Sequence, residues 1–172
     1  MAKSRDYIYM DVLDLKGRKL GYVNDLIVDF GRKTVIGFKM NSFKLKKAQR
    51  EVLKESIVYH HSDIIAGSTC EVSGLEFSSV LNMHVVDINF NVIGLVSEVL
   101  FDGKTFEIKG LMVKKSSFLD MFTPRKILLL KDLIIGEKYI LYMSRCRNIE
   151  MECIPSVGMG LPAKMEVYYE KD

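Results

Sequence analysis

Polar and apolar residues alternate along the ten residues from Leu20 to Asp29. The apolar positions fall on one face of an extended chain, interrupted by Asn24: Leu20, Tyr22, Leu26 and Val28. Alternation with a period of two residues indicates a half-buried β-strand. The pattern therefore predicts a strand that buries this face and places Asp25 and Asp29 on the opposite one.

The neighbouring segments continue the pattern. Tyr9–Leu15 reads as a strand that ends at the turn Lys16-Gly17-Arg18, and Thr34–Asn41 reads as a strand that follows another turn. Short strands at regular spacing, separated by turn residues, favour a meander that curls into a small barrel. No long amphipathic helix is expected, although Glu55–His61 and Lys131–Glu137 each have room for one helical turn.

The same pattern occurs twice. Met10–Met40 aligns with Met83–Val113 without a gap, at a shift of 73 residues (from position 10 to 83). Identical positions are Met10/Met83, Val12/Val85, Asp14/Asp87, Gly21/Gly94, Val23/Val96, Asp29/Asp102 and Gly37/Gly110. Self-similarity of this kind indicates two copies of one module. We predict a first module at 4–72, a second at 74–145, related by a pseudo-twofold axis, and a C-terminal extension at 146–172.

The repeated residues resemble the PRC-barrel domain. The motif is Val12, Asp14, Gly21, Val23, Asp25, Asp29 and Gly37 in the first copy, and Val85, Asp87, Gly94, Val96, Glu98, Asp102 and Gly110 in the second. Two positions depart from it: a glycine common before the first strand is Tyr9 and Asn82 here, and the turn glycine Gly17 is replaced by Phe90. The resemblance implies an all-β protein of two tandem PRC-type barrels.

The resemblance also implies a class of function. PRC-barrel domains occur in the photosynthetic reaction-centre H subunit, in the ribosome-maturation factor RimM and in small bacterial and archaeal proteins, some sporulation-associated. Members of the family have no known catalysis and act as interaction modules. Function still has to be argued from the residues of this chain, because a fold does not determine an activity.

The composition of the chain indicates the cellular compartment in which it resides. The chain has 172 residues, 48% of them apolar and 27% charged, with a net charge of +3, which is typical of a folded globular protein. It has neither an apolar run of the ~20 residues that span a bilayer nor the apolar core of a signal peptide. Its cysteines, Cys70, Cys146 and Cys153, form no CxxC pair, so we expect reduced thiols in the cytoplasm.

Candidate catalytic and metal-binding residues are few. Asp25 and Asp29 stand four residues apart on one strand, roughly 13 Å at ~3.3 Å per residue, whereas hydrolytic carboxylate pairs need about 5–9.5 Å. We therefore expect them to be carboxylates at an exposed position or at the rim of the sheet that bond turn backbone. His60 and His61 are adjacent and point to opposite faces of a strand, which does not make a metal site. We predict no catalytic residue, no metal and no cofactor.

Basic residues gather after the third strand of each copy. A phosphate-contacting surface would use Lys44, Lys46, Lys47, Arg50, Lys114, Lys115 and Arg125 if the two groups faced the same way. The alternative interpretation is solvated loops whose lysines keep strand edges from pairing with other chains.

The end of the chain, Ala163–Glu170, alternates again and reads as a strand. It would cover the seam between the modules, or join a sheet edge of its own chain or of a neighbouring copy in a homo-oligomer. Together these patterns predict a non-enzymatic cytoplasmic protein-interaction module. The alternative is an RNA- or ribosome-associated factor that uses the basic loops.

Overall fold

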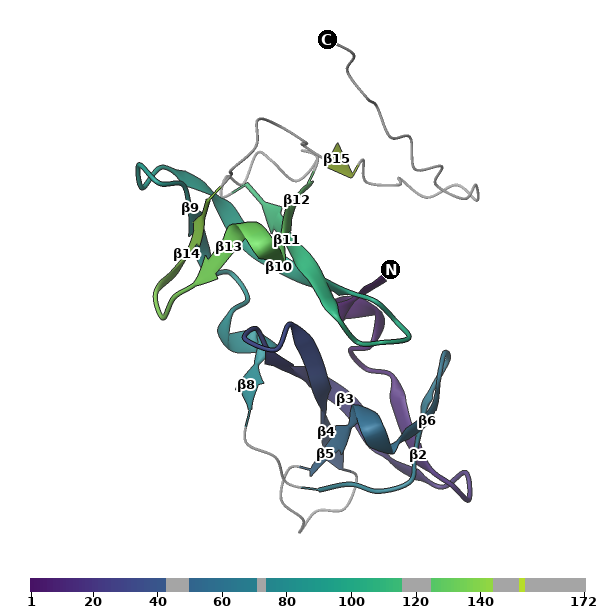
Figure 1. The fold of residues 1–172 in the computed structure, drawn as a ribbon. Coiled ribbons are helices and arrows are strands. Elements are labelled where there is room, and N and C mark those ends of the chain that lie inside the picture. Colours follow the sequence, from purple (N-terminus) through teal and green to yellow (C-terminus); the bar gives the residue numbers. More distant parts are fainter. Residues whose placement is uncertain (43–49, 71–73, 116–124, 144–151, 154–172) are drawn as a thin grey trace.

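The computed structural model describes residues 1–42, 50–70, 74–115, 125–143 and 152–153. The described part is all-β: it contains short 3-10 turns and no α-helix. Its strands form two sheets, one for each copy of the sequence repeat (Figure 1). The predicted all-β fold with two repeats is therefore confirmed.

The first repeat forms a seven-stranded sheet with the order β5-β4-β3-β2-β7-β6, to which β8 is added on β3. Its strands are β2 (Asp11–Asp14), β3 (Lys19–Asp29), β4 (Thr34–Ser42), β5 (Arg50–Leu53), β6 (Ile57–His60), β7 (Ile64–Ala66) and β8 (Leu75–Glu76). The turn Lys54–Ser56 joins β5 to β6. All pairings are antiparallel except that of β2 with β7.

The second repeat forms an eight-stranded sheet with the order β13-β14-β9-β10-β11-β12-β15, to which β1 is added on β10. Its strands are β1 (Ala2–Lys3), β9 (His84–Val86), β10 (Val92–Phe101), β11 (Ile108–Lys114), β12 (Arg125–Leu129), β13 (Leu133–Ile135), β14 (Tyr139–Tyr142) and β15 (Glu152–Cys153). The parallel pair is again the equivalent one, β9 with β14. The segments predicted to hold helical turns form 3-10 turns at Lys54–Ser56 and Leu130–Asp132, each followed by a strand.

The two repeats are related by a pseudo-twofold axis. Thr34 of the first repeat forms an antiparallel bridge with Glu107, its own equivalent in the second. Val35 N–H donates to the Phe106 carbonyl at 2.9 Å, and Ile108 N–H donates to the Lys33 carbonyl at 2.7 Å. Each of these bonds maps onto the other under the shift of 73 residues, as a twofold axis at this point requires.

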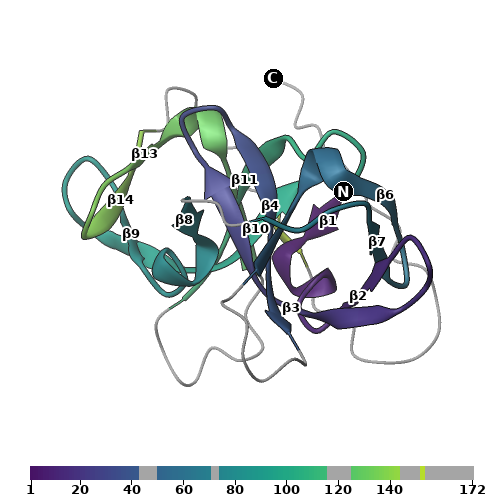
Figure 2. The ribbon, with the colours of Figure 1, turned by 90° about the horizontal axis from the view of Figure 1, so that it is seen from below.

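One apolar core serves both repeats. Buried side chains of the two sheets form a single cluster, which includes Val23, Phe38, Val96 and Phe101. Figure 2 shows the two curled sheets side by side, with their long strands at the seam. The repeats therefore stabilise each other by burying apolar surface against each other.

The buried face of β3 is not the predicted one along its whole length. Val23 and Asp25 are buried, whereas Leu20 and Tyr22 are half-buried. The register between β3 and β4 shifts between Val23 and Asp25, which is a β-bulge. A bulge adds one residue to one strand, so the side chains after it change faces. β10 has the equivalent shift between Val96 and Glu98.

Two motif glycines allow close approach of neighbouring strands. A Cβ at Gly21 would collide with the backbone carbonyl oxygen of Asn41, and one at Gly94 with that of Lys114. Close backbone contact of this kind is typical of glycine in a tightly curled sheet.

Candidate interaction surfaces

Each repeat sends a short arm to the other. The first arm, residues 2–6, is β1 followed by the 3-10 turn Ser4–Asp6, and it pairs with β10 of the second repeat. The second arm, residues 75–79, is β8 followed by the 3-10 turn Phe77–Ser79, and it pairs with β3 of the first repeat. The arms are equivalent under the repeat and are exchanged reciprocally (Figure 1).

The buried motif acids hold these arms. Glu98 accepts hydrogen bonds from Ser4 Oγ at 2.7 Å and from Arg5 N–H at 3.1 Å. Asp25, its equivalent, accepts one from Ser78 N–H at 3.2 Å. Both acids are 6% exposed, so the prediction that Asp25 is an exposed carboxylate is wrong. Asp25 is buried because the second arm covers its face of β3 and supplies the donors that a buried carboxylate requires.

The other motif aspartates hold turns. Asp29 accepts a hydrogen bond from Arg32 N–H at 2.8 Å, which confirms its predicted role. Asp102 accepts hydrogen bonds from the N–H groups of Thr105 and Lys104. These bonds, that of Thr105 most of all, lower the pKa of the Asp102 carboxyl. Each of these motif carboxylates therefore accepts backbone N–H groups of a turn or of an arm.

An aromatic cluster lies where the repeats meet. Tyr7, at the end of the first arm, stacks on Phe38 of the first repeat with ring centroids 4.9 Å apart and lies 5.3 Å from Phe101 of the second. Its hydroxyl lies 3.1 Å from His60 Nδ1. Burial, and then the neighbouring His61, lower the pKa of His60. The neutral imidazole is therefore the form that fits this contact.

The outer face of the second repeat carries an unbroken apolar row. Ile134, Leu141, Val86 and Val92 are consecutive cross-strand partners on β13, β14, β9 and β10. Their neighbours Ile135, Ile140 and Val85 point inward to the core. Ile134 and Val92 are 50% and 55% exposed. Cross-strand neighbours in a sheet lie about 4.8 Å apart, so this row is a continuous apolar strip. Its two ends are exposed, whereas Leu141 is half-buried and Val86 is buried.

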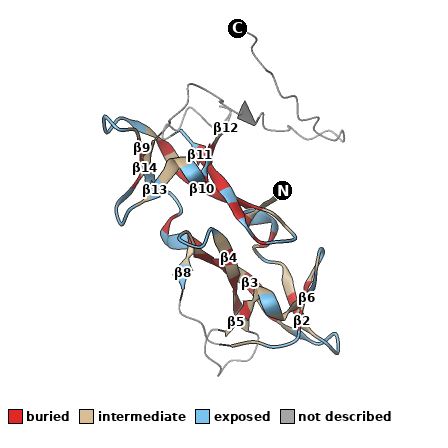
Figure 3. Cartoon of the chain, in the orientation of Figure 1, coloured by how far each residue is buried: buried red, intermediate tan, exposed pale blue. Residues whose placement is uncertain are grey.

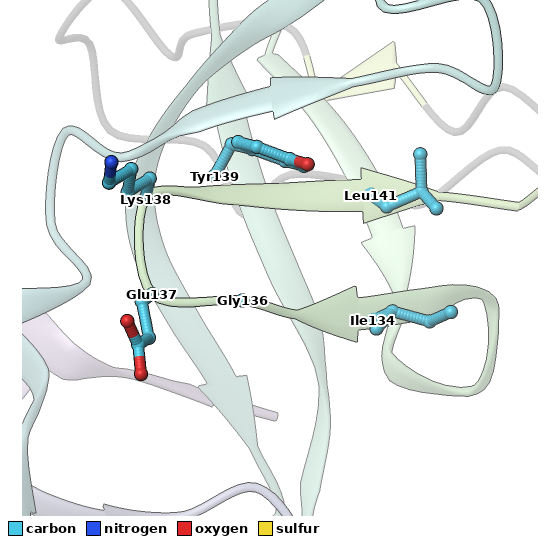
Figure 4. A pocket seen from close by; sticks show the side chains of 6 residues that line it. All are labelled: Ile134, Gly136, Glu137, Lys138, Tyr139 and Leu141. Carbon is cyan, nitrogen blue, oxygen red and sulfur yellow. The ribbon is translucent and has the colours of Figure 1, made fainter.

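Phe90 and Tyr139 extend the strip. Their rings meet edge to face at 5.8 Å, and Ile88 beside them is exposed. A shallow pocket of about 430 Å³ lies over the β13–β14 hairpin, lined by Ile134, Gly136, Glu137, Lys138, Tyr139 and Leu141 (Figure 4). We call the strip with these residues the repeat-2 face: Val86, Ile88, Phe90, Val92, Ile134, Tyr139 and Leu141. Exposed residues of this hairpin are visible in Figure 3.

Phe90 occupies a conformation that disfavours its side chain. It has φ of 62°, in the left-handed region, where its equivalent Gly17 has φ of 75°. The turn is otherwise the same in both repeats, since Asp14 Oδ1 and Asp87 Oδ1 each accept two backbone N–H groups. A side chain with a Cβ costs roughly 1–2 kcal/mol there. Turn geometry alone therefore gives no reason for a phenylalanine that is 66% exposed.

The equivalent face of the first repeat is divided by charge. Its row is Tyr59, Ile65, Leu13 and Lys19, in the same register. Lys19 forms a salt bridge of 2.6 Å with Asp11 across the face, and Arg18 forms another with Asp14. Tyr9, Leu15 and Tyr59 are exposed around these ion pairs.

The described basic residues occupy separate places. β5, which begins with Arg50, and β12, which begins with Arg125, lie at opposite ends of the molecule (Figure 1). Arg50 donates to Thr69 Oγ1, and Arg125 lies 3.9 Å from the buried Glu98. Lys114 and Lys115 are exposed. Lys44, Lys46 and Lys47 lie outside the described residues, as does the predicted strand Ala163–Glu170.

Candidate chemical groups do not converge within the described part. No three side chains of His, Cys, Asp or Glu there lie close enough together to hold a metal ion. His60 faces Tyr7, and His61 is exposed. Cys70 has a free thiol and belongs to a backbone bridge with Glu51, whereas Cys146 lies outside the described residues.

Comparison with known families agrees with this geometry. The profile of the PRC-barrel domain matches twice, at residues 1–59 and 74–144. The chain belongs to the PRC-barrel family. No curated protein matches this PRC-barrel chain. The family matches contain the motif residues named from the sequence, and each begins with the arm that pairs with the other sheet, but they do not indicate a partner.

Sequence reasoning missed the arms and the repeat-2 face. The arms carry only two strand residues each, too few for a periodic signal. The face had one visible signal, which is the apolar substitution of turn residues between otherwise aligned copies. Phe90 stands where the first copy has Gly17, and Val92 where it has Lys19.

Proposed function

We propose that this PRC-barrel protein is a non-enzymatic interaction module that docks proteins on the repeat-2 face. The observation that carries the proposal is the row Ile134–Leu141–Val86–Val92, with Phe90 exposed beside it in a left-handed turn. Large exposed apolar patches usually mark binding sites in folded proteins. Exposed aromatic side chains are common anchors of such interfaces.

The interlocked repeats would serve as a rigid support for this face. The exchanged arms, the shared core and the bridge at Thr34 fix one repeat against the other. Docking on a rigid surface avoids the entropic cost of ordering it. We place this function in the cytoplasm because of the composition and because the sequence has no CxxC pair. In the described residues, no helix has the length and apolar character to cross a membrane.

The test is affinity capture from cells that express the protein natively, with the chain immobilised at low density. The wild type is compared with the double variant Phe90→Gly/Val92→Lys, which gives the second repeat the residues of the first. We expect specific proteins to bind the wild type and to be lost from the variant.

A matched control separates docking from folding. Tyr59→Lys changes the first-repeat position equivalent to Ile134, and it should retain every captured protein. Ile134→Lys should lose them. Equal capture by all four proteins, or none by the wild type, would contradict the proposed function.

The alternative, an RNA- or ribosome-associated factor, has less support in the described residues. β5 and β12 lie at opposite ends, so Arg50 and Arg125 belong to different surfaces. Binding through phosphates weakens steeply with salt. Ribosomal RNA binding that is lost on raising the salt concentration and on substitution of Lys114 and Lys115 would favour this alternative.

A further inference from the structure

The repeat-2 face has the properties of a surface that binds its own copy. The face has an exposed aromatic ring, and the apolar pocket beside it is also lined by a carboxylate and an ammonium group. We infer that two copies of this chain associate through their repeat-2 faces about a twofold axis. This inference rests on the proposed docking role of the face and names its occupant.

Shape is the first reason. A twofold interface uses the same patch on both molecules, so the patch must contain both members of every complementary pair. Phe90 is 66% exposed, and the pocket of about 430 Å³ lies on the adjoining hairpin, bordered by Tyr139, which Phe90 contacts. In a twofold pair, Phe90 of one molecule faces the pocket of the other, and the reverse holds at the same time.

Charge is the second reason. The turn of the first repeat has three cations, Lys16, Arg18 and Lys19, and the same positions in the second repeat are uncharged. Asp87 is the one charged side chain of this turn, so the face has no excess of positive charge, repels its own copy only weakly and has little attraction for nucleic acid or anionic lipid. Glu137 and Lys138 stand side by side at the pocket and point to different sides of it (Figure 4). Rotation about a twofold axis brings Glu137 of one molecule to face Lys138 of the other.

Area is the third reason. Five large apolar side chains of the face are 42–68% exposed: Ile88, Phe90, Val92, Ile134 and Tyr139. At roughly 150–250 Å² for a large aromatic side chain and somewhat less for an aliphatic one, they present on the order of 500 Å² of surface. A standard interface buries about 800 Å² per partner, of which about 65% is apolar in homodimers. The exposed apolar area of one face is therefore close to the apolar area that each partner buries in a homodimer interface of standard size.

The experiment is sedimentation equilibrium of the full chain from low micromolar to submillimolar concentration. We expect the mass to rise from the 19.7 kDa of one chain toward twice that value. Phe90→Gly and Ile134→Lys should each raise the dissociation constant about tenfold or more, as expected for anchor residues. Tyr59→Lys, the first-repeat equivalent of Ile134→Lys, should leave it unchanged.

Phe90→Gly also guards against a folding artefact. It relieves the left-handed strain, so the variant should resist denaturant at least as well as the wild type while dimerising less. Reduced dimerisation with retained stability supports the inference, and so does the insensitivity of the Tyr59 variant.

Two results would overturn the inference. One is a wild-type chain that stays monomeric throughout the concentration range, and the other is a dimer that none of the repeat-2 variants weakens. If the chain is monomeric but captured proteins are still lost from Phe90→Gly/Val92→Lys, the face binds a different protein, and the proposed function stands without the homodimer.

Discussion

The turn before the long strand has the same backbone in both repeats and different side chains. In each, an aspartate accepts two backbone N–H groups and the third residue after it is left-handed. The first repeat uses cations and glycine, and the second uses amides and apolar residues: Lys16, Gly17, Arg18 and Lys19 against Asn89, Phe90, Asn91 and Val92.

The difference shows which positions the fold requires. The aspartates, the close-approach glycines and the buried acids have equivalents in both copies and the same structural task. The turn side chains and the outer rows differ, although the backbone beneath them does not. Positions that differ under identical backbone are free to carry function, and here they turn one face apolar and leave the other charged.

The largest expected effect tests the shared positions. Gly21→Val and Gly94→Val each place a Cβ against a carbonyl oxygen of the next strand. Each should lower the free energy of unfolding by about 3 kcal/mol, the upper end of overpacking effects. Denaturant titration measures this loss. Gly67→Ala is the control, because its nearest neighbour would be 3.8 Å away, and it should be close to neutral.

The buried acids should differ from each other. Glu98→Ala leaves the Ser4 hydroxyl and the Arg5 N–H without their acceptor, and should cost about 2–3 kcal/mol. Asp25→Ala removes the acceptor of the second arm's Ser78 N–H, and of Leu26 N–H, and should cost about 1–2 kcal/mol. Trypsin cleavage after Arg5 under native conditions should accelerate in the Glu98 variant. An unchanged cleavage rate would show that Glu98 does not hold the first arm.

Exchanging the left-handed turn residue between the two repeats tests the strain at that position. Phe90→Gly should stabilise the fold by about 1 kcal/mol, and Gly17→Phe should destabilise it by about 1–2 kcal/mol, because only glycine adopts the left-handed conformation without strain. Thermal unfolding of both variants gives the values. Destabilisation by Phe90→Gly would mean that the Phe90 ring contributes more to the fold than its exposure indicates.

The smallest expected effect is a difference between the repeats in how pH changes their contribution to stability. The folded-state pKa of His60 is lowered, so the unfolded chain binds the proton more readily. Its contribution to stability is therefore present above its unfolded pKa of about 6.5 and is lost as pH falls toward the folded value. The equivalent strand position in the second repeat is Ile135. His60→Phe should flatten the stability profile between pH 7 and 5, measured by urea titration, while Ile135→Val should leave its shape unchanged.

The sequence predicted the strands and their duplication because both depend on local periodicity. Leu20–Asp29 was correctly identified as a strand, and Asp29 as a turn ligand. The burial of Asp25 was not predictable from alternation, because an arm of the other repeat covers its face of the strand. The exchanged arms depend on pairing between distant residues, Ala2 with Phe101 in the first arm and Glu76 with Ile27 in the second, which no local pattern reports. The apolar turn of the second repeat was visible, but its exposure came from the structure.

The exchanged arms also determine when this chain can finish folding. Ala2 pairs with Phe101, so β1 cannot form its pairing until β10 has been synthesised. β3 in turn waits for Leu75 and Glu76, which begin the next repeat. Contacts between such distant positions close late and slow the search for the native state. Although the gene encodes two copies in succession, the nascent chain has no complete half, and we expect folding and unfolding to be single events shared by both repeats.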